Sequence, residues 1–158
     1  MTLDDSRAAE PGPSDDARRR ARQLDETLPD IDWTVPPRGA VRGWVDAPSG
    51  RIATLSQGDP AAPLVLLVPG VTGSKEDFAL MLPLLADAGF HAVSYDMAGQ
   101  YESRDAGPEH LRPPRPNYDH DLFVGDLLFM LESAPGPAHV LGYSFAGTVA
   151  QIAYTRSP

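Results

Sequence analysis

A serine flanked by small residues gives this sequence its clearest chemical signal. The run GYSFAG spans residues 142–147 and places Ser144 directly after an apolar stretch and before a helical pattern. A serine at such a strand-to-helix turn is typical of a nucleophile elbow, which presents the hydroxyl for attack on a carbonyl carbon. The tight turn requires small residues two positions before and two positions after the serine. Gly142 and Ala146 meet this requirement, and Gly147 relieves packing one residue further on.

Two backbone N–H groups are expected to stabilise the negative charge that forms in such a reaction. Phe145 opens the helix after Ser144, so its N–H lies at the positive end of the helix dipole. Gly70 ends another apolar run, and a glycine there lets the backbone approach a substrate closely, which makes the Val71 N–H the second candidate donor. Alone, Ser144 could equally cap a helix and Gly70 could be a turn glycine. Their occurrence after two strands of one predicted sheet favours the catalytic interpretation.

Hydrophobic periodicity predicts the elements that position these residues. Strand-like runs at 41–46 and 51–56, joined by a turn at 47–50, predict an antiparallel hairpin. The continuously apolar run at 64–68 is typical of a strand covered on both faces. Further strands are predicted at 90–97 and 138–143, and helices at 74–88, 119–133 and 145–156. This alternation predicts an α/β fold with a mainly parallel sheet and helices on both faces.

Composition limits the class of protein. The chain has 158 residues, a net charge of −9 and no cysteine, which argues for one domain and against disulfides, thiolate metal sites and nucleic-acid binding. Residues 1–40 are poor in large apolar groups and are expected to be a disordered or loosely ordered tail and linker, followed by a domain at 41–158. No apolar run is long enough for a membrane span, and no basic face for a membrane surface is evident, so we expect a cytoplasmic protein.

Residues from about 41 to 158 resemble the N-terminal half of an α/β-hydrolase-fold protein. Three blocks carry the resemblance: the strand and oxyanion loop in LVLLVPGVTGSKEDF (64–78), the Asp-x-x-Gly-x-x-x-Ser stretch in SYDMAGQYES (94–103), and the elbow in HVLGYSFAGTVAQ (139–151). The resemblance implies that Ser144 is the nucleophile and that Val71 and Phe145 supply the oxyanion donors. It implies a small-molecule carbonyl substrate such as an ester or thioester, and neither a cofactor nor a metal.

The sequence also departs from the family pattern. Pro69 stands where the family often has histidine, and Ala146 replaces the second glycine of Gly-x-Ser-x-Gly. Neither change removes a nucleophile or a backbone donor. Serine rather than aspartate at position 144 argues against the dehalogenase and epoxide hydrolase branches of the family.

The acid and the base are the main difficulty. In the family resembled they follow later strands, whereas Ser144 stands 14 residues before Pro158. We therefore expect a fold that is incomplete at its C-terminus, inactive alone, with the Ser144 strand at an open sheet edge. His91 and His139 are predicted at the far strand ends, and His110 and His120 in or beside a long connection. The alternative is a non-catalytic binding or interaction protein with this fold; the oligomeric state is left open.

Overall fold

The computed structural model describes residues 14–28 and 30–158, and the chain divides into two compact units between Asp32 and Trp33. In the first unit, helix α1 (Asp15–Thr27) has no buried residue. Ser14 caps it by accepting the Ala17 N–H at 3.2 Å. Two acidic residues in its first turn interact favourably with the positive end of the helix dipole. The expectation for residues 1–13 lies outside the described residues. Within the described ranges, no helix is long and apolar enough to cross a membrane.

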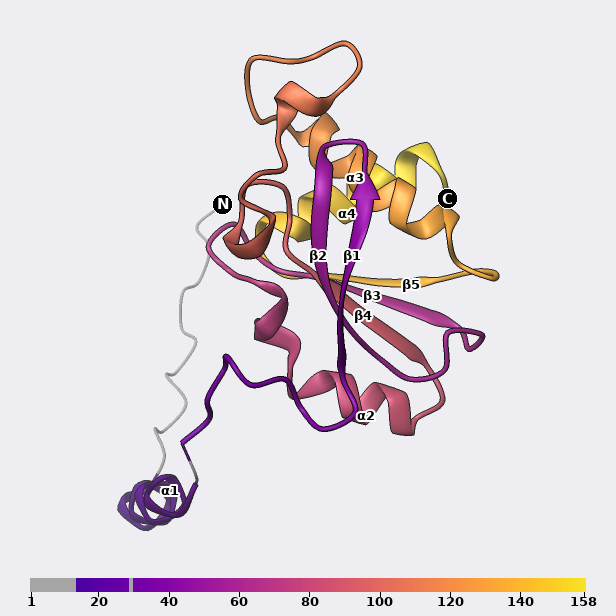
Figure 1. The fold of residues 1–158 in the computed structure, drawn as a ribbon. Coiled ribbons are helices and arrows are strands. Elements are labelled where there is room, and N and C mark those ends of the chain that lie inside the picture. The colour runs from indigo at the N-terminus through magenta and orange to yellow at the C-terminus, as the bar shows by residue number, and fades with distance from the viewer. Residues whose placement is uncertain (1–13, 29) are drawn as a thin grey trace, which may run out of the picture. The chain divides into compact units, whose positions relative to one another are not determined.

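The second unit is built on a five-stranded sheet with the order β1-β2-β4-β3-β5 (Figure 1). The strands are β1 (Val41–Ala47), β2 (Gly50–Gln57), β3 (Leu64–Val68), β4 (His91–Tyr95) and β5 (His139–Gly142). β1 and β2 form the predicted antiparallel hairpin, and β2 joins β4 antiparallel. β3 pairs in parallel with both β4 and β5, so the carboxyl ends of these three strands meet at one edge. The sheet is therefore mixed: β4, β3 and β5 are parallel to one another, and β2 runs antiparallel to both of its neighbours.

Helices cover both faces of the sheet, as predicted (Figure 1). The helical segments are the 3₁₀ turns η1 (Lys75–Phe78), η2 (Tyr101–Ser103) and η3 (Pro108–His110), and the α-helices α2 (Met81–Asp87), α3 (His120–Glu132) and α4 (Phe145–Arg156). Leu127 of α3 and Val149 of α4 belong to one buried cluster on the sheet, whereas Phe78 of η1 and Leu82 of α2 belong to a second. Because helices pack apolar side chains on both faces of the sheet, every residue of β3 is buried.

The helix predicted at 74–88 is divided in the structure. A 3₁₀ turn ends at Phe78 and α2 begins at Met81. Pro83 therefore lies in the first turn of α2, where a backbone N–H has no intrahelical acceptor, and it does not bend a continuous helix. Gly89 ends the segment with a φ of 89°, a conformation that glycine adopts readily.

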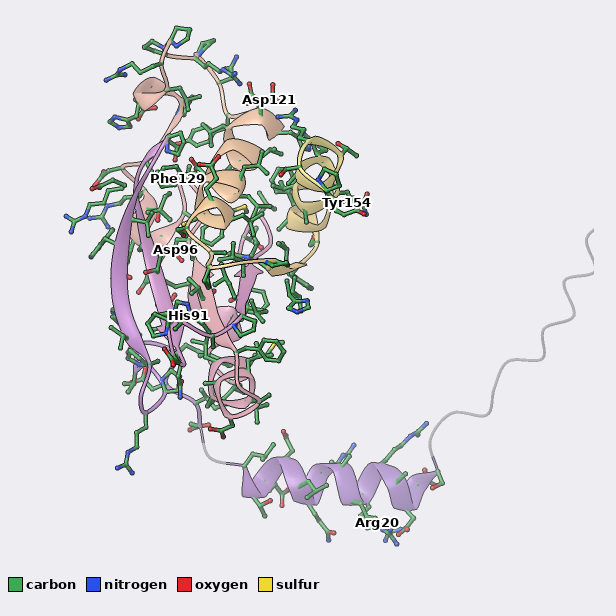
Figure 2. The ribbon with its side chains drawn as sticks, turned by 90° about the vertical axis from the view of Figure 1, so that its right-hand side faces the viewer. Arg20, His91, Asp96, Asp121, Phe129 and Tyr154 are labelled. Atoms are coloured by element: carbon green, nitrogen blue, oxygen red, sulfur yellow. The ribbon has the colours of Figure 1, made fainter. Side chains whose placement is uncertain are left out.

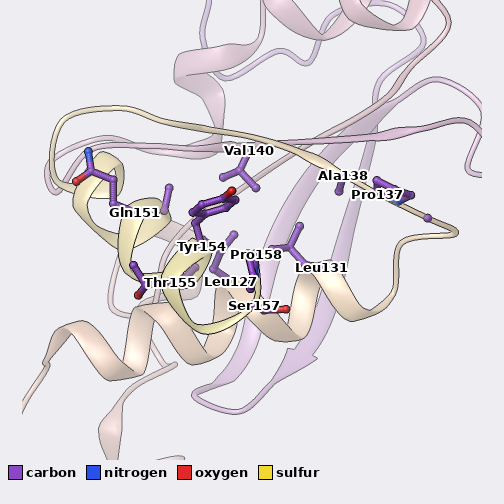
Figure 3. Close-up of a pocket in the computed structure, with 13 residues that line it drawn as sticks. Leu127, Leu131, Pro137, Ala138, Val140, Gln151, Tyr154, Thr155, Ser157 and Pro158 are labelled. Carbon is purple, nitrogen blue, oxygen red and sulfur yellow. The ribbon is translucent and has the colours of Figure 1, made fainter.

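β5 forms one edge of the sheet, since β3 is its partner among the described strands. Beside β5, a groove of about 740 Å³ opens between α3 and α4 (Figure 3). Leu127, Leu131, Val140 and Tyr154 contribute to its largely apolar lining. β5, the strand that leads to Ser144, thus has one edge without a described partner strand and an apolar groove beside it.

Candidate active site

Ser144 occupies the turn between β5 and α4 in a strained conformation. Its φ is 54° and its ψ is −117°, a region that residues other than glycine rarely adopt. The side chain is exposed and accepts no capping hydrogen bond from α4, so the interpretation of Ser144 as a helix cap is wrong. The backbone holds the turn instead: Ala146 N–H donates to Tyr143 O at 3.1 Å and Gly147 N–H donates to Ser144 O at 2.9 Å.

The small residues around Ser144 differ in how strictly they are required. A Cβ atom on Gly142 would lie 2.3 Å from Ala146 O and 2.5 Å from its carbonyl carbon, so any side chain there overlaps the backbone of α4. Ala146 is fully buried beneath the turn. A Cβ atom on Gly147 would lie 3.5 Å from Gly142 O, which is an ordinary contact. The space at Gly147 therefore does not demand glycine.

The loop after β3 approaches the Ser144 turn closely. A Cβ atom on Gly70 would lie 3.4 Å from Ser144 Cβ and 3.1 Å from Tyr143 Cδ1. The next residue, Val71, is exposed, and no hydrogen bond from its N–H is found in the part of the chain that the structure describes. Phe145 is the first residue of α4, so its N–H has no intrahelical acceptor. One candidate oxyanion donor thus lies in the loop that approaches Ser144, and the other lies at the first residue of α4, directly after Ser144.

A cavity of about 380 Å³ adjoins these loops. Val71 and Phe145 line it, together with Met97, Ala98, Gly99, Gln100, Tyr118 and Phe123. The ring of Phe123 stacks with Tyr118 at 6.1 Å and meets Phe145 edge-on at 5.4 Å. These rings form an aromatic wall suited to an apolar group of a ligand. The larger groove beside β5 includes none of the residues predicted for the site.

A buried ion cluster ties the loop after β3 to the loop after β4. Lys75 Nζ lies 3.0 Å from Asp96 Oδ2 and 3.0 Å from Glu76 Oε1, and it also contacts Glu102. Asp96, which lies inside the domain (Figure 2), accepts the Lys75 N–H at 2.7 Å and the Glu102 N–H at 3.1 Å. The carboxylate thus binds its own loop, as a strand-ending aspartate often does, and the neighbouring loop as well.

The protonation of this cluster follows from burial and pairing. Burial alone would lower the pKa of Lys75, but hydrogen bonds with Glu102, Glu76 and Asp96 outweigh it and hold the pKa above 10.5. For Asp96, burial raises the pKa above 3.8, and the hydrogen bonds from Lys75 offset part of that rise. The Lys75 hydrogen bond lowers the pKa of Glu102. Lys75 therefore remains an ammonium that neutralises carboxylates within the loop cluster.

Gln100 forms a second link between the same two loops. Its Nε2 group donates to Gly70 O at 2.8 Å and to Val71 O at 3.0 Å. Its Oε1 atom accepts the Met97 N–H at 2.9 Å. One side chain from the loop after β4 thus binds two successive carbonyl groups of the loop that carries the Val71 donor.

In the part of the chain that the structure describes, no hydrogen bond joins any of the four histidines to Ser144. His91 and His139 begin β4 and β5, at the ends of those strands opposite to the site, as predicted. His110 Nε2 lies 3.0 Å from Asp105 O, and the His120 ring packs 5.2 Å from the Phe145 ring. The described residues also contain no group of three or more side chains that could hold a metal ion. The site therefore brings together Ser144, Gly70, Val71 and Phe145 without a histidine base.

The sequence profile of the alpha/beta hydrolase family matches residues 65–157. The chain belongs to the α/β hydrolase family. Among relatives of this α/β hydrolase, the probable oxidoreductase EphD of Mycobacterium tuberculosis is 35% identical over 117 residues, which cover 72% of this chain and 18% of that protein. Epoxide hydrolase A of the same organism is 31% identical over 88 residues, which cover 56% of this chain and 26% of the relative.

Solved structures of α/β hydrolases show the same architecture. An epoxide hydrolase from an endophytic Streptomyces has a TM-score of 0.61 and 28% identity over 75% of this chain and 34% of its own. The thioesterase domain from the curacin biosynthetic pathway has a TM-score of 0.63 and 18% identity over 75% of this chain and 40% of its own, which shows the fold alone. The chain therefore spans only a minor part of the length of the relatives that it matches.

Sequence reasoning missed two residues that shape the α/β hydrolase site. Lys75 falls at the start of the helix predicted at 74–88 and belongs to no predicted site, although it is the single lysine among the 13 lysine and arginine residues. Gln100 lies within the stretch at 94–103 that resembles the family, but the pattern assigns it no role. The isolated use of lysine could have drawn attention to position 75, whereas no local signal distinguishes Gln100.

Proposed function

We propose that this α/β hydrolase chain carries the nucleophile and oxyanion hole of a serine hydrolase. Ser144 would form an acyl-enzyme with an ester, a thioester or a related carbonyl substrate. The observation that carries the proposal is the Ser144 turn itself: a strained, exposed serine that caps no helix, with the Gly70 loop in contact range. Strain of this kind is costly and occurs where a functional geometry needs it.

The chemistry follows from the geometry of the two loops. The Ser144 Oγ atom bonds to the carbonyl carbon while a base removes its proton, and the carbonyl electrons move to the oxygen. The N–H groups of Val71 and Phe145 stabilise that oxyanion. Collapse of the intermediate releases the alcohol or thiol, which takes the proton, and water then hydrolyses the acyl-enzyme by the same steps.

The general base is not identified: within the described residues, no hydrogen bond joins a histidine to Ser144. We therefore propose that the 158 residues alone turn over substrate very slowly. In serine hydrolases, loss of the base lowers kcat by about 10⁴–10⁶-fold. The match covers only 18% of the EphD relative and 34% of the Streptomyces enzyme. Serine hydrolysis by the whole protein is therefore part of the same proposal.

The identity of residue 144 favours acyl transfer over epoxide opening. The relatives that carry the name epoxide hydrolase indicate the family, but this chain has serine at position 144, which argues against that branch. The aromatic cavity beside Val71 and Phe145 suits an apolar acyl or aryl group. We therefore propose an apolar ester or thioester as the substrate class.

A serine-directed fluorophosphonate tests the nucleophile in the full-length protein. We expect one phosphonate adduct on the peptide that contains Ser144, detected by mass spectrometry, and its loss in Ser144→Ala. Ser157→Ala, which removes an exposed serine at the end of α4, serves as the matched control and should label like the parent. Labelling that persists in Ser144→Ala would contradict the proposal. Absence of labelling in the parent, with no ester turnover, would favour the non-catalytic alternative.

A further inference from the structure

The amide of Gln100 has one orientation that satisfies all its neighbours. Two carbonyl oxygens, those of Gly70 and Val71, face one end of the amide, and the Met97 N–H faces the other. Carbonyl oxygens need donors and the N–H needs an acceptor, so Nε2 must face the loop after β3. In the opposite orientation, Oε1 would face the two carbonyl oxygens, and the amide N–H groups would face the Met97 N–H. The hydrogen bonds to the two carbonyls are therefore determined by chemistry as well as by position.

The Gln100 side chain also starts from a fixed backbone. The Gln100 N–H donates to Met97 O at 2.9 Å, so the turn at residues 97–100 is closed by the main chain as well as by the side-chain amide. The Gly99 N–H donates to Ser103 O at 3.0 Å, which secures the following turn. Just before this turn, Asp96 is held by Lys75. Gln100 thus acts from a rigid loop on a neighbouring loop.

Peptide geometry connects Gln100 with the candidate oxyanion donor. In a trans peptide the C=O and the following N–H lie in one plane and point in opposite directions. The Gly70 C=O is held by Gln100 Nε2 at 2.8 Å and by the Gly73 N–H at 3.0 Å. The Val71 N–H of the same peptide therefore points away from both of these partners, Gln100 and Gly73. A rotation of this peptide would remove the donor from the site and break two hydrogen bonds at once.

We propose that Gln100 is a positioning residue for the oxyanion hole: it holds the Gly70–Val71 peptide so that the Val71 N–H can bind the oxyanion. This inference rests on the proposed function of Ser144. Gln100 does not touch the reacting atoms, and it acts through the orientation of one peptide group. Its loss should therefore affect transition-state stabilisation more than substrate binding.

Two substitutions in the full-length protein test this role. Gln100→Glu keeps the shape but places a carboxylate against the Gly70 and Val71 carbonyls, and Gln100→Met keeps the length without a donor. We expect both to lower kcat for an apolar aryl ester by roughly 10²-fold, the effect of losing one oxyanion donor, with KM little changed. Gln151→Glu, an exposed position on α4, makes the same charge change away from the site and should keep the parent kcat.

A crystal structure of each Gln100 variant provides a readout that does not depend on activity. We expect the Gly70–Val71 peptide to rotate in Gln100→Glu, and an unchanged peptide in both variants would overturn the inference. A rise in KM of about 10²-fold in the two Gln100 variants, with the parent kcat preserved, would overturn it as well. If Ser144→Ala keeps the parent turnover, the proposed function fails, and the peptide orientation still decides whether Gln100 positions this loop. Thermal melts of both variants establish that they fold.

Discussion

Lys75 Nζ lies 3.0 Å from Asp96 Oδ2, and neither side chain has any exposed surface. The pair joins η1, which follows the candidate oxyanion loop, to the residue that follows β4. Removal of Lys75 would leave the Asp96 carboxylate buried without its cation, whereas Lys75 itself also contacts Glu76 and Glu102. The ion pair is thus a condition for keeping the two loops together, whatever its net contribution to stability.

Lys75→Met should be strongly destabilising. Asp96 and Glu76 would remain buried without the ammonium, and breaking a buried ion pair in this way costs about 3–5 kcal/mol. Urea denaturation followed by circular dichroism measures the loss. Arg42→Met is the matched control, because Arg42 pairs with Glu102 at 3.6 Å in a partly exposed position, where such pairs contribute at most about 1 kcal/mol. Equal losses in the two variants would contradict the role assigned to Lys75.

Asp126 should make stability depend on pH. Its carboxylate is buried on α3 and accepts the Ser49 hydroxyl at 2.6 Å and the Ser49 N–H at 3.1 Å. Burial raises the pKa of Asp126 above 3.8, and the bonds from Ser49 offset part of the rise. The folded state therefore binds this proton more tightly than the unfolded state does. The stability contributed by the protonated form is present below a pH of about 3.8 and is lost as the pH rises through the folded pKa.

Asp126→Asn tests this pH dependence, since the amide keeps an acceptor for the Ser49 N–H but cannot ionise. Free energies of unfolding in urea at about pH 4 and about pH 7 should show the parent losing stability relative to the variant at the higher pH. Asp126→Ala leaves the buried Ser49 groups without partners and should cost about 1–3 kcal/mol at either pH. A difference between parent and Asp126→Asn that does not change with pH would show that burial does not govern this carboxyl group.

The parts of the fold that sequence could predict are those encoded by local periodicity. The hairpin, the buried strand at 64–68 and the helix at 145–156 have bounds close to the predicted ones because apolar spacing and turn residues mark them. The contacts that hold the site together have no such mark. Lys75 meets Asp96 across 21 positions and Gln100 meets Gly70 across 30, and no periodic pattern records a single polar contact at that separation.

The open edge at β5 should cause self-association of the 158-residue chain. Among the described strands β5 pairs with β3 alone, so its other edge offers unpaired backbone groups, and Leu141 on this strand is 38% exposed. Exposed strand edges pair with other strands, and a lysine on the edge opposes this. Leu141→Lys should therefore shift the chain toward monomer in sedimentation velocity. Leu84→Lys is the matched control, because Leu84 is exposed on α2, which packs mainly on β2 and β4 rather than on β5. It should leave the distribution of sedimentation coefficients unchanged. A monodisperse parent would disprove the expectation.

The two glycines that flank the Ser144 turn should respond oppositely to alanine. In Gly142→Ala, the new Cβ would lie 2.3 Å from Ala146 O, so the start of α4 must move, and overpacking of this kind costs about 1–3 kcal/mol. In Gly147→Ala, the nearest atom would lie 3.5 Å away, and alanine is favoured over glycine inside a helix by about 1 kcal/mol. Thermal unfolding should therefore show a lower Tm for Gly142→Ala and an equal or higher Tm for Gly147→Ala. Phosphonate labelling should slow in Gly142→Ala, because the displaced turn carries Ser144 and the Phe145 N–H. A Gly142→Ala variant with the parent Tm and labelling rate would show that the turn tolerates a side chain, and that its tight packing does not hold Ser144 in place.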